Sequence, residues 1–165
     1  MKRSWLLSAL LLTASHAAVA QSADPLAAAG SHDPMELARA VDRLGDEALL
    51  TRLSDDDRAT RLTAIRASPW MRGPELALDP LSELAIGRDP ELAPAAMQAS
   101  VRIARGLDAG TLFVRESPPE GLQGAAARYR ALADDDTARP DLRAAARVVV
   151  AQLADAGASG EPTSE

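Results

Sequence analysis

The sequence contains no cysteine and very few aromatic side chains. Its 165 residues include two Trp, one Tyr and one Phe. Without Cys there are no disulfides and no thiol-based catalysis, so the fold depends on packing alone. A β-sandwich or barrel is disfavoured, because aromatic and β-branched side chains usually fill pleated sheets. Ala and Leu must supply most of the core, which predicts helices.

Asparagine is absent and Lys2 is the only lysine. No Asn-glycosylation acceptor therefore exists. The 18 basic residues are outnumbered by 24 acidic ones, for a net charge of −6. Loss of Lys2 and Arg3 with a cleaved leader leaves 16 basic against 24 acidic residues, a net charge of −8. An acidic protein repels phosphate backbones, so we expect no nucleic-acid partner.

Long apolar runs are also lacking, apart from a short one near the start. Residues 2–3 are positive, residues 5–13 are mostly apolar, and residues 18–20 read Ala-Val-Ala, an A-x-A cleavage site. The run is well short of the roughly 20 residues that span a bilayer. We predict a signal peptide at 1–20, export to the periplasm or the extracellular space, and no stable membrane insertion after cleavage.

The remaining chain divides into three parts. Residues 21–32 are rich in Ala, Gly and Ser, which predicts a flexible lead. Residues 33–155 show helical periodicity and are expected to form one all-α domain. Residues 156–165 are small and polar, which is typical of a disordered tail.

Turn residues place the expected helices. Asp33-Pro34 predicts an N-cap followed by Pro at the first helical position. Asp46 is expected to cap the second helix, and Ser54 with Asp57 to open the third as a near-capping box. The helices are expected from 34 to 44, 46 to 53, 54 to 67, 74 or 79 to 86, 89 to beyond 103, 124 to 133 and 140 to 153.

Three of these helices share one apolar stripe. Thr60, Leu92 and Leu142 are equivalent positions, and the residues four, seven and eleven positions later lie on the same helix face. Small residues there let neighbouring helices approach closely, which favours stacking. The three sets are Ala64, Ala67 and Met71; Ala96, Ala99 and Ile103; and Ala146, Val149 and Leu153.

Each of these helices follows a Leu-rich helix and an acidic turn, a unit that resembles HEAT-like repeats. The resemblance covers residues 46–154 and implies a short α-solenoid of about three stacked helical pairs. An irregular helical bundle is the alternative. Pro94 departs from the pattern and should bend or delay its helix. The resemblance is carried by Asp57, Thr60, Arg61, Ala64 and Ala67; Asp89, Pro90, Leu92, Ala96 and Ala99; and Asp141, Leu142, Arg143 and Ala146.

The acidic runs 55–57 and 134–136 are conspicuous. Carboxylates can bind calcium, but neither run has a calcium-loop spacing, and both precede a helix, where acids stabilise free N–H groups. We therefore expect capping rather than a metal site. His32 has no identifiable catalytic partners, and no G-x-S-x-G motif is present. We predict a non-enzymatic protein without a cofactor; a carboxylate-based hydrolase is a distant alternative.

The candidate partner-binding residues are Trp70 and the arginines of the second helices, which commonly line the inner surface of stacked repeats. These arginines could hold a carboxylate-bearing partner. The favoured interpretation is that Arg61 and Arg143 pair with turn acids of adjacent repeats, as the resemblance implies. Trp70 either fills a gap between helix pairs, which is favoured, or anchors a partner. The six arginines are Arg61, Arg66, Arg102, Arg105, Arg143 and Arg147.

These patterns together predict an exported helical-repeat protein that binds an unknown protein or peptide along one helix face. The alternative is a structural accessory subunit of an envelope assembly, which uses its helix faces for fixed packing. Phe113, in the apolar cluster 112–114, is expected to dock the long connection between 106 and 124 rather than to contact a ligand.

Overall fold

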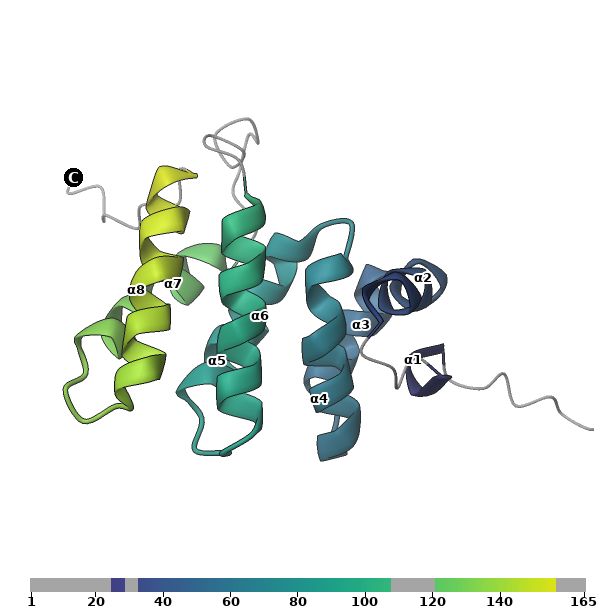
Figure 1. Cartoon of the computed structure of the whole chain (residues 1–165), viewed down its shortest axis with the longest axis horizontal. Helices are drawn as coiled ribbons and strands as arrows, with labels where there is room; N and C mark the ends of the chain where they lie inside the picture. The colour runs from purple at the N-terminus through teal and green to yellow at the C-terminus, as the bar shows by residue number, and fades with distance from the viewer. Residues whose placement is uncertain (1–24, 29–32, 108–120, 157–165) are drawn as a thin grey trace, which may run out of the picture.

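The computed structural model describes residues 25–28, 33–107 and 121–156 (Figure 1). Within these ranges the chain is all-α, as predicted, and contains no strand. The predicted signal peptide at 1–20, His32 and the cluster 112–114 lie outside the described residues. The helices are α1 (Pro25–Ala28), α2 (Pro34–Leu44), α3 (Asp46–Leu53), α4 (Arg58–Ala67), α5 (Leu78–Ile86), α6 (Leu92–Gly106), α7 (Leu122–Asp134) and α8 (Pro140–Asp155), with 3-10 turns η1 (Ser68–Trp70) and η2 (Pro74–Ala77).

From α3 onwards, the helices pack as pairs in chain order. α3 lies against α4, α5 against α6, and α7 against α8. Figure 1 shows α4, α6 and α8 side by side, in front of a second row that contains α5 and α7. The contacts of α6 with both α4 and α8, and of α5 with α7, agree with this view. We call α4, α6 and α8 the second-helix layer.

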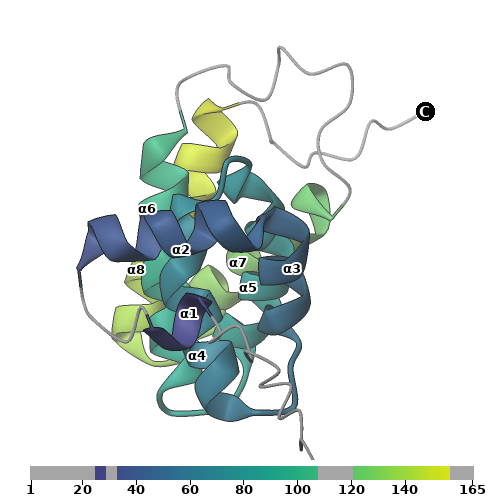
Figure 2. The same cartoon turned by 90° about the vertical axis from the view of Figure 1, so that its right-hand side faces the viewer.

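The N-terminal helices cover one end of these two rows. α2 contacts α3, α4 and η1, and Figure 2 shows it lying across that end. α1 lies in the stretch expected to be a flexible lead, yet it packs on α2 and α4, and Leu26 is only 1% exposed. At the other end of the domain, Ala156 caps α8 and is also 1% exposed. Leu26 and Ala156 therefore both belong to the core of the described domain.

Most of the apolar stripe predicted from the sequence is buried in the second-helix layer, but Thr60 is only half-buried, and Met71, although buried, lies beyond the end of α4. Ala64, Ala96 and Ala146 have no exposed surface. The large residues Ile103 and Leu153 are buried with them and contribute to one core cluster. Because alanine has only a Cβ, the three helices can approach closely along this stripe, and the larger residues fill the space near the helix ends.

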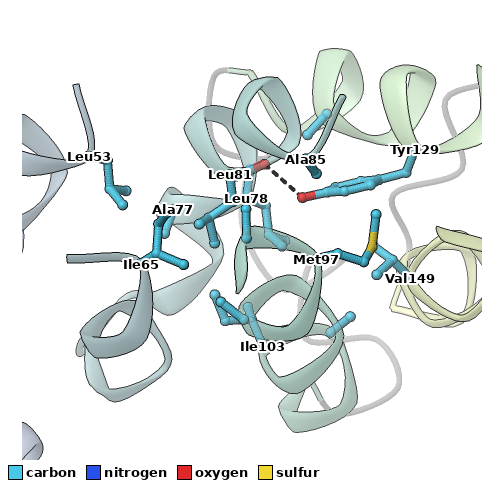
Figure 3. Close-up of a cluster of buried hydrophobic side chains, with 14 of the residues drawn as sticks. Leu53, Ile65, Ala77, Leu78, Leu81, Ala85, Met97, Ile103, Tyr129 and Val149 are labelled. Atoms are coloured by element: carbon cyan, nitrogen blue, oxygen red, sulfur yellow. Dashed lines mark hydrogen bonds between the residues drawn. The ribbon is translucent and has the colours of Figure 1, made fainter. Parts of the chain in front are cut away.

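A polar group lies inside this core (Figure 3). The Tyr129 hydroxyl of α7 lies 2.6 Å from Ser100 Oγ of α6 and 3.3 Å from the carbonyl oxygen of Leu78 at the start of α5. Ser100 Oγ also donates to the carbonyl of Ala96. Burial raises the pKa of the Tyr129 phenol above its ordinary value, because the charged form cannot be solvated there. The phenol thus links the second and third helical pairs.

Several helix ends form as the turn residues predicted. Asp33 caps α2 by accepting from the backbone N–H of Met35, and α2 ends before Gly45. Asp57 caps α4 by accepting from the backbone N–H of Thr60 at 2.7 Å. The Thr60 hydroxyl also donates to this carboxylate and, as the largest cause, lowers the pKa of Asp57.

Two predicted roles near these caps are wrong. Ser54 is the C-cap of α3 and does not open the next helix, because Asp57 already occupies its N-cap. Asp46 is the first residue of α3 and does not cap it. Its carboxylate accepts instead from the backbone N–H groups of Arg72 and Gly73, at 3.2 and 2.9 Å. Asp46 therefore connects α3 to the loop before η2.

The run 134–136 does not cap the following helix either. Asp135 accepts from both the backbone N–H and the hydroxyl of Thr137, which closes the turn. The N-cap position of α8 is held by Arg139 and has no side-chain cap bond. Because residues 137–139 separate the run from the helix, its carboxylates stabilise the turn instead of the helix end.

Pro94 delays its helix as predicted. The turn at 89–91 is closed by the Asp89 carboxylate, which accepts from the backbone N–H groups of Glu91 and Leu92 at 2.9 Å each. α6 begins at Leu92, so Pro94 lies in the first turn. A missing N–H is tolerated there, because the first turn has no intrahelical partner for that group.

Candidate functional site

Two neighbouring grooves mark the second-helix layer. The first groove, about 510 Å³, lies between α4 and α6 and is also lined by α2 and η1. The second groove, also about 510 Å³, lies between α6 and α8. Pro94, Gln98 and Arg102 of α6 line both, so this helix is their shared wall. Their volumes fall within the range typical of ligand sites, about 300–1,000 Å³.

Three of the six candidate arginines line these grooves. Arg66 and Arg102 line the first groove, and Arg102 and Arg105 line the second. All three are exposed, and none forms an ion pair with another described residue. We call them the groove arginines.

Trp70 holds one of these arginines against the groove wall. The Arg102 guanidinium carbon lies 5.1 Å from the centroid of the Trp70 ring, within the range of a cation–π contact. Trp70 is half-buried, packs on the core and lines the first groove. The ring thus packs on the core at the edge of the first groove and positions Arg102 at the surface.

The acidic side chains that line the grooves are already paired. Glu91, in the first groove, forms an ion pair with Arg58. The Arg58 guanidinium also donates two hydrogen bonds to the Asp89 carboxylate, at 2.8 and 2.9 Å, and holds the pKa of that carboxyl well below its ordinary value. Asp141, in the second groove, pairs with Arg139 at 2.6 Å. Because these carboxylates pair with other arginines, they do not neutralise the positive charge of the groove arginines.

The other three candidate arginines lie away from the grooves. Arg143 donates to Asp136 at 2.6 Å, and Arg147 donates to the carbonyl of Ala133 at 3.3 Å, so both turn toward the loop between α7 and α8. Arg61 forms no ion pair with a described residue, and its Nε is buried without a hydrogen-bond partner there. The predicted pairing with adjacent repeats is therefore wrong for both Arg61 and Arg143, since Asp136 belongs to the same helical pair as Arg143.

Two arginines that the sequence reasoning missed make the links between helical pairs. Arg58, at the start of α4, reaches the turn before α6, a role expected of Arg61. Arg128 of α7 donates to Asp79 of α5 at 2.6 Å and to Glu83 at 3.1 Å. The role of Arg58 could have been predicted from its position in the first turn of its helix. This position lies at the same end of the second-helix layer as the acidic turn of the next helical pair.

Neither of the acidic runs, 55–57 and 134–136, forms a metal-binding cluster with other described residues. Among the described residues, no three His, Cys, Asp or Glu side chains lie close enough to hold one. Asp55 accepts from the backbone N–H of Asp57 at 2.8 Å, so this run is used within its own turn. Within the same ranges, no helix combines the length and apolar character required to cross a bilayer.

Comparison of the chain with protein-family models, curated proteins and solved structures finds no match. The resemblance to HEAT-like repeats therefore stays a prediction from the sequence. The chemistry that the described residues offer is that of the grooves: guanidinium groups beside apolar walls, suited to ion pairing and apolar contact.

Proposed function

We propose that this chain is an exported, non-enzymatic helical-repeat protein that binds a protein or peptide partner through its second-helix layer. The observation that carries the proposal is the pair of grooves, in which three arginines have no carboxylate partner among the described residues. Repeat proteins use extended faces of this kind for binding, because one helix of each pair contributes to the same surface.

The packing of the helices supports a short α-solenoid of HEAT-like type. The pairs α3 with α4, α5 with α6, and α7 with α8 follow one another in the chain, and each contacts its neighbours. The three apolar stripes lie in one layer, as a repeat requires. α2 covers the first pair and would act as its cap.

Photo-crosslinking tests this function. Gln98 lies in the shared wall of the grooves and is exposed, whereas Ala127 is exposed on α7, in the other row. A benzoylphenylalanine at either position can be irradiated in envelope extract of the producing cells. We expect a defined crosslinked protein from position 98 and none from position 127.

The opposite pattern, with crosslinks only from position 127, would place the partner on the other row and refute the proposed surface. The alternative, a structural subunit of an envelope assembly, predicts that the isolated chain folds poorly and is rescued by coexpression with a neighbouring gene product. A cooperative thermal transition of the isolated protein would contradict that alternative.

A further inference from the structure

We propose that the two grooves take one extended acidic segment of a partner protein, which crosses α6. Its carboxylates would pair with Arg66 and Arg102 in the first groove and with Arg105 in the second. This inference rests on the proposed function and adds the chemistry of the occupant.

Charge complementarity selects an acidic occupant. The chain carries 24 acidic and 18 basic residues, so its carboxylates outnumber its basic groups. Among the described arginines that form no ion pair, Arg66, Arg102 and Arg105 are the ones that line the grooves, while Glu91 and Asp141 beside them are neutralised by Arg58 and Arg139. A basic segment would meet uncompensated positive charge there, whereas a carboxylate meets a planar guanidinium that it can engage with two hydrogen bonds.

Arg102 is positioned to bind before the partner arrives. Its stacking on Trp70 restricts the guanidinium, which lowers the entropy lost when a carboxylate pairs with it. It lines both grooves, and Arg105 lies three residues further along α6, on the same helix face. A segment that crosses this helix can therefore contact both Arg102 and Arg105, which lie about one turn apart.

The walls between the arginines select apolar residues beside the acids. In the first groove, Leu62 and Ala95 are half-buried and leave apolar surface open. In the second, Val101 and Ala145 do the same. The preferred sequence is therefore one in which Asp or Glu alternates with small or aliphatic residues, in an extended conformation that reaches across both grooves.

The probe for this inference is a phage-displayed library of random peptides, panned on the immobilised protein. We expect the enriched peptides to be rich in Asp and Glu interspersed with aliphatic residues. Enriched peptides without an excess of acids, or no enrichment above an unrelated immobilised protein, would overturn the inference.

A charge-reversal pair then locates the site. In the variant Arg66→Glu with Arg102→Glu, an enriched synthetic peptide should bind at least about tenfold more weakly, because repulsion replaces two ion pairs. The matched control is Arg88→Glu with Arg130→Glu, which makes the same charge change at exposed residues that line neither groove. The control should retain binding, and both variants should keep the wild-type circular dichroism spectrum.

Three outcomes separate this inference from the proposed function. If the enriched peptides bind the groove variant as tightly as the control while position 98 still crosslinks, the acidic-segment inference is wrong and the function stands. If position 127 crosslinks instead, the proposed function fails. If light scattering shows a dimer that the groove variant abolishes, the grooves hold a second copy of this chain, and the acidic-segment inference is overturned.

Discussion

Arg58, Arg139 and Arg143, near the acidic turns, form ion pairs, whereas the groove arginines in the last two turns of α4 and α6 do not. Arg58 begins α4 and lies beside the carboxylates of the next turn. Arg66 and Arg105 lie in the last turns of their helices, at the end opposite the acidic turns. The negative end of the helix dipole stabilises a cation there without a carboxylate, which leaves the guanidinium available to a partner.

The buried phenol gives a prediction at alkaline pH. The folded-state pKa of Tyr129 lies above its unfolded value of about 10, so the stabilisation is complete below that pH and is lost as the pH rises. The chain has one tyrosine, one lysine and no cysteine, so few other groups titrate in this range. We expect the Tm to fall steeply above about pH 10.

In Tyr129→Phe, we expect this alkaline loss to be much smaller. At neutral pH the substitution should cost about 1 kcal/mol, because the hydrogen bonds of the hydroxyl are lost while Ser100 keeps its bond to Ala96. Thermal unfolding followed by circular dichroism between neutral and alkaline pH measures both effects. Equal alkaline slopes in the two proteins would contradict the burial argument.

The Asp89 carboxylate gives the opposite prediction, at acid pH. Its folded-state pKa is lowered, chiefly by the hydrogen bond from Arg58, so the stabilisation is present above the unfolded value of about 3.9 and is lost as the pH falls. Asp89→Asn keeps an oxygen for the turn N–H groups but removes the charge. We expect a Tm lower by a few degrees at neutral pH and a shallower loss of Tm on acidification.

Asp56→Asn is the matched control for Asp89→Asn. Asp56 is exposed, and no hydrogen bond to a described residue involves its side chain. Its Tm should follow that of the wild type across the same acid titration. If the Tm of Asp89→Asn fell on acidification as steeply as that of the wild type, the ion pair with Arg58 would contribute nothing measurable to stability.

At the scale of the helix, the small-residue stripe controls how closely the second helices pack. Ala146 of α8 has no exposed surface, and this helix contacts both α6 and α7. Ala146→Leu introduces three carbon atoms with no space to hold them. We expect a loss of about 1–3 kcal/mol in the free energy of unfolding, measured with urea.

Ala151→Leu makes the same change at an exposed site of the same helix. It should alter the free energy of unfolding by no more than about 0.5 kcal/mol. Equal effects at the two positions would mean that the stripe does not limit the approach of the helices, and that α8 can shift to accept a larger side chain.

At the scale of the whole molecule, one core joins all the helices. The buried cluster runs from Leu26 of α1 to Ala156 after α8 without a break into separate clusters. Arg58 and Arg128 add links between successive helical pairs. Since no pair has a core of its own, the described domain should unfold as one unit.

Cooperativity can be measured with two probes. In a Trp5→Phe variant, Trp70 is the only tryptophan, and its fluorescence reports on the region around α4 and α6. Far-ultraviolet circular dichroism reports on all helices. We expect the two urea transitions to have the same midpoint and slope. A fluorescence transition that precedes the loss of helicity would show that the first helical pair unfolds separately.

The agreement between sequence and structure is best where local rules apply. The ends of α2 at Gly45 and of α5 at Gly87, and the cap at Asp57, follow from propensities of single residues. The predictions for Asp46 and for the run 134–136 are wrong because these carboxylates bind groups other than the free N–H groups of the helix start: Asp135 accepts from Thr137, and Asp136 from the side chain of Arg143. Asp46 binds N–H groups 26 and 27 residues away.

The all-α class and the apolar stripes follow from the amino-acid sequence, because helix periodicity and the scarcity of aromatic residues are local and compositional properties. Which arginines form ion pairs depends on the packing of the helices. Arg58 donates to Asp89, which lies 31 residues away in the sequence, and the Arg102 guanidinium of α6 lies over the Trp70 ring of η1. Such contacts depend on how the helices pack, and this packing leaves Arg66, Arg102 and Arg105 open to a partner.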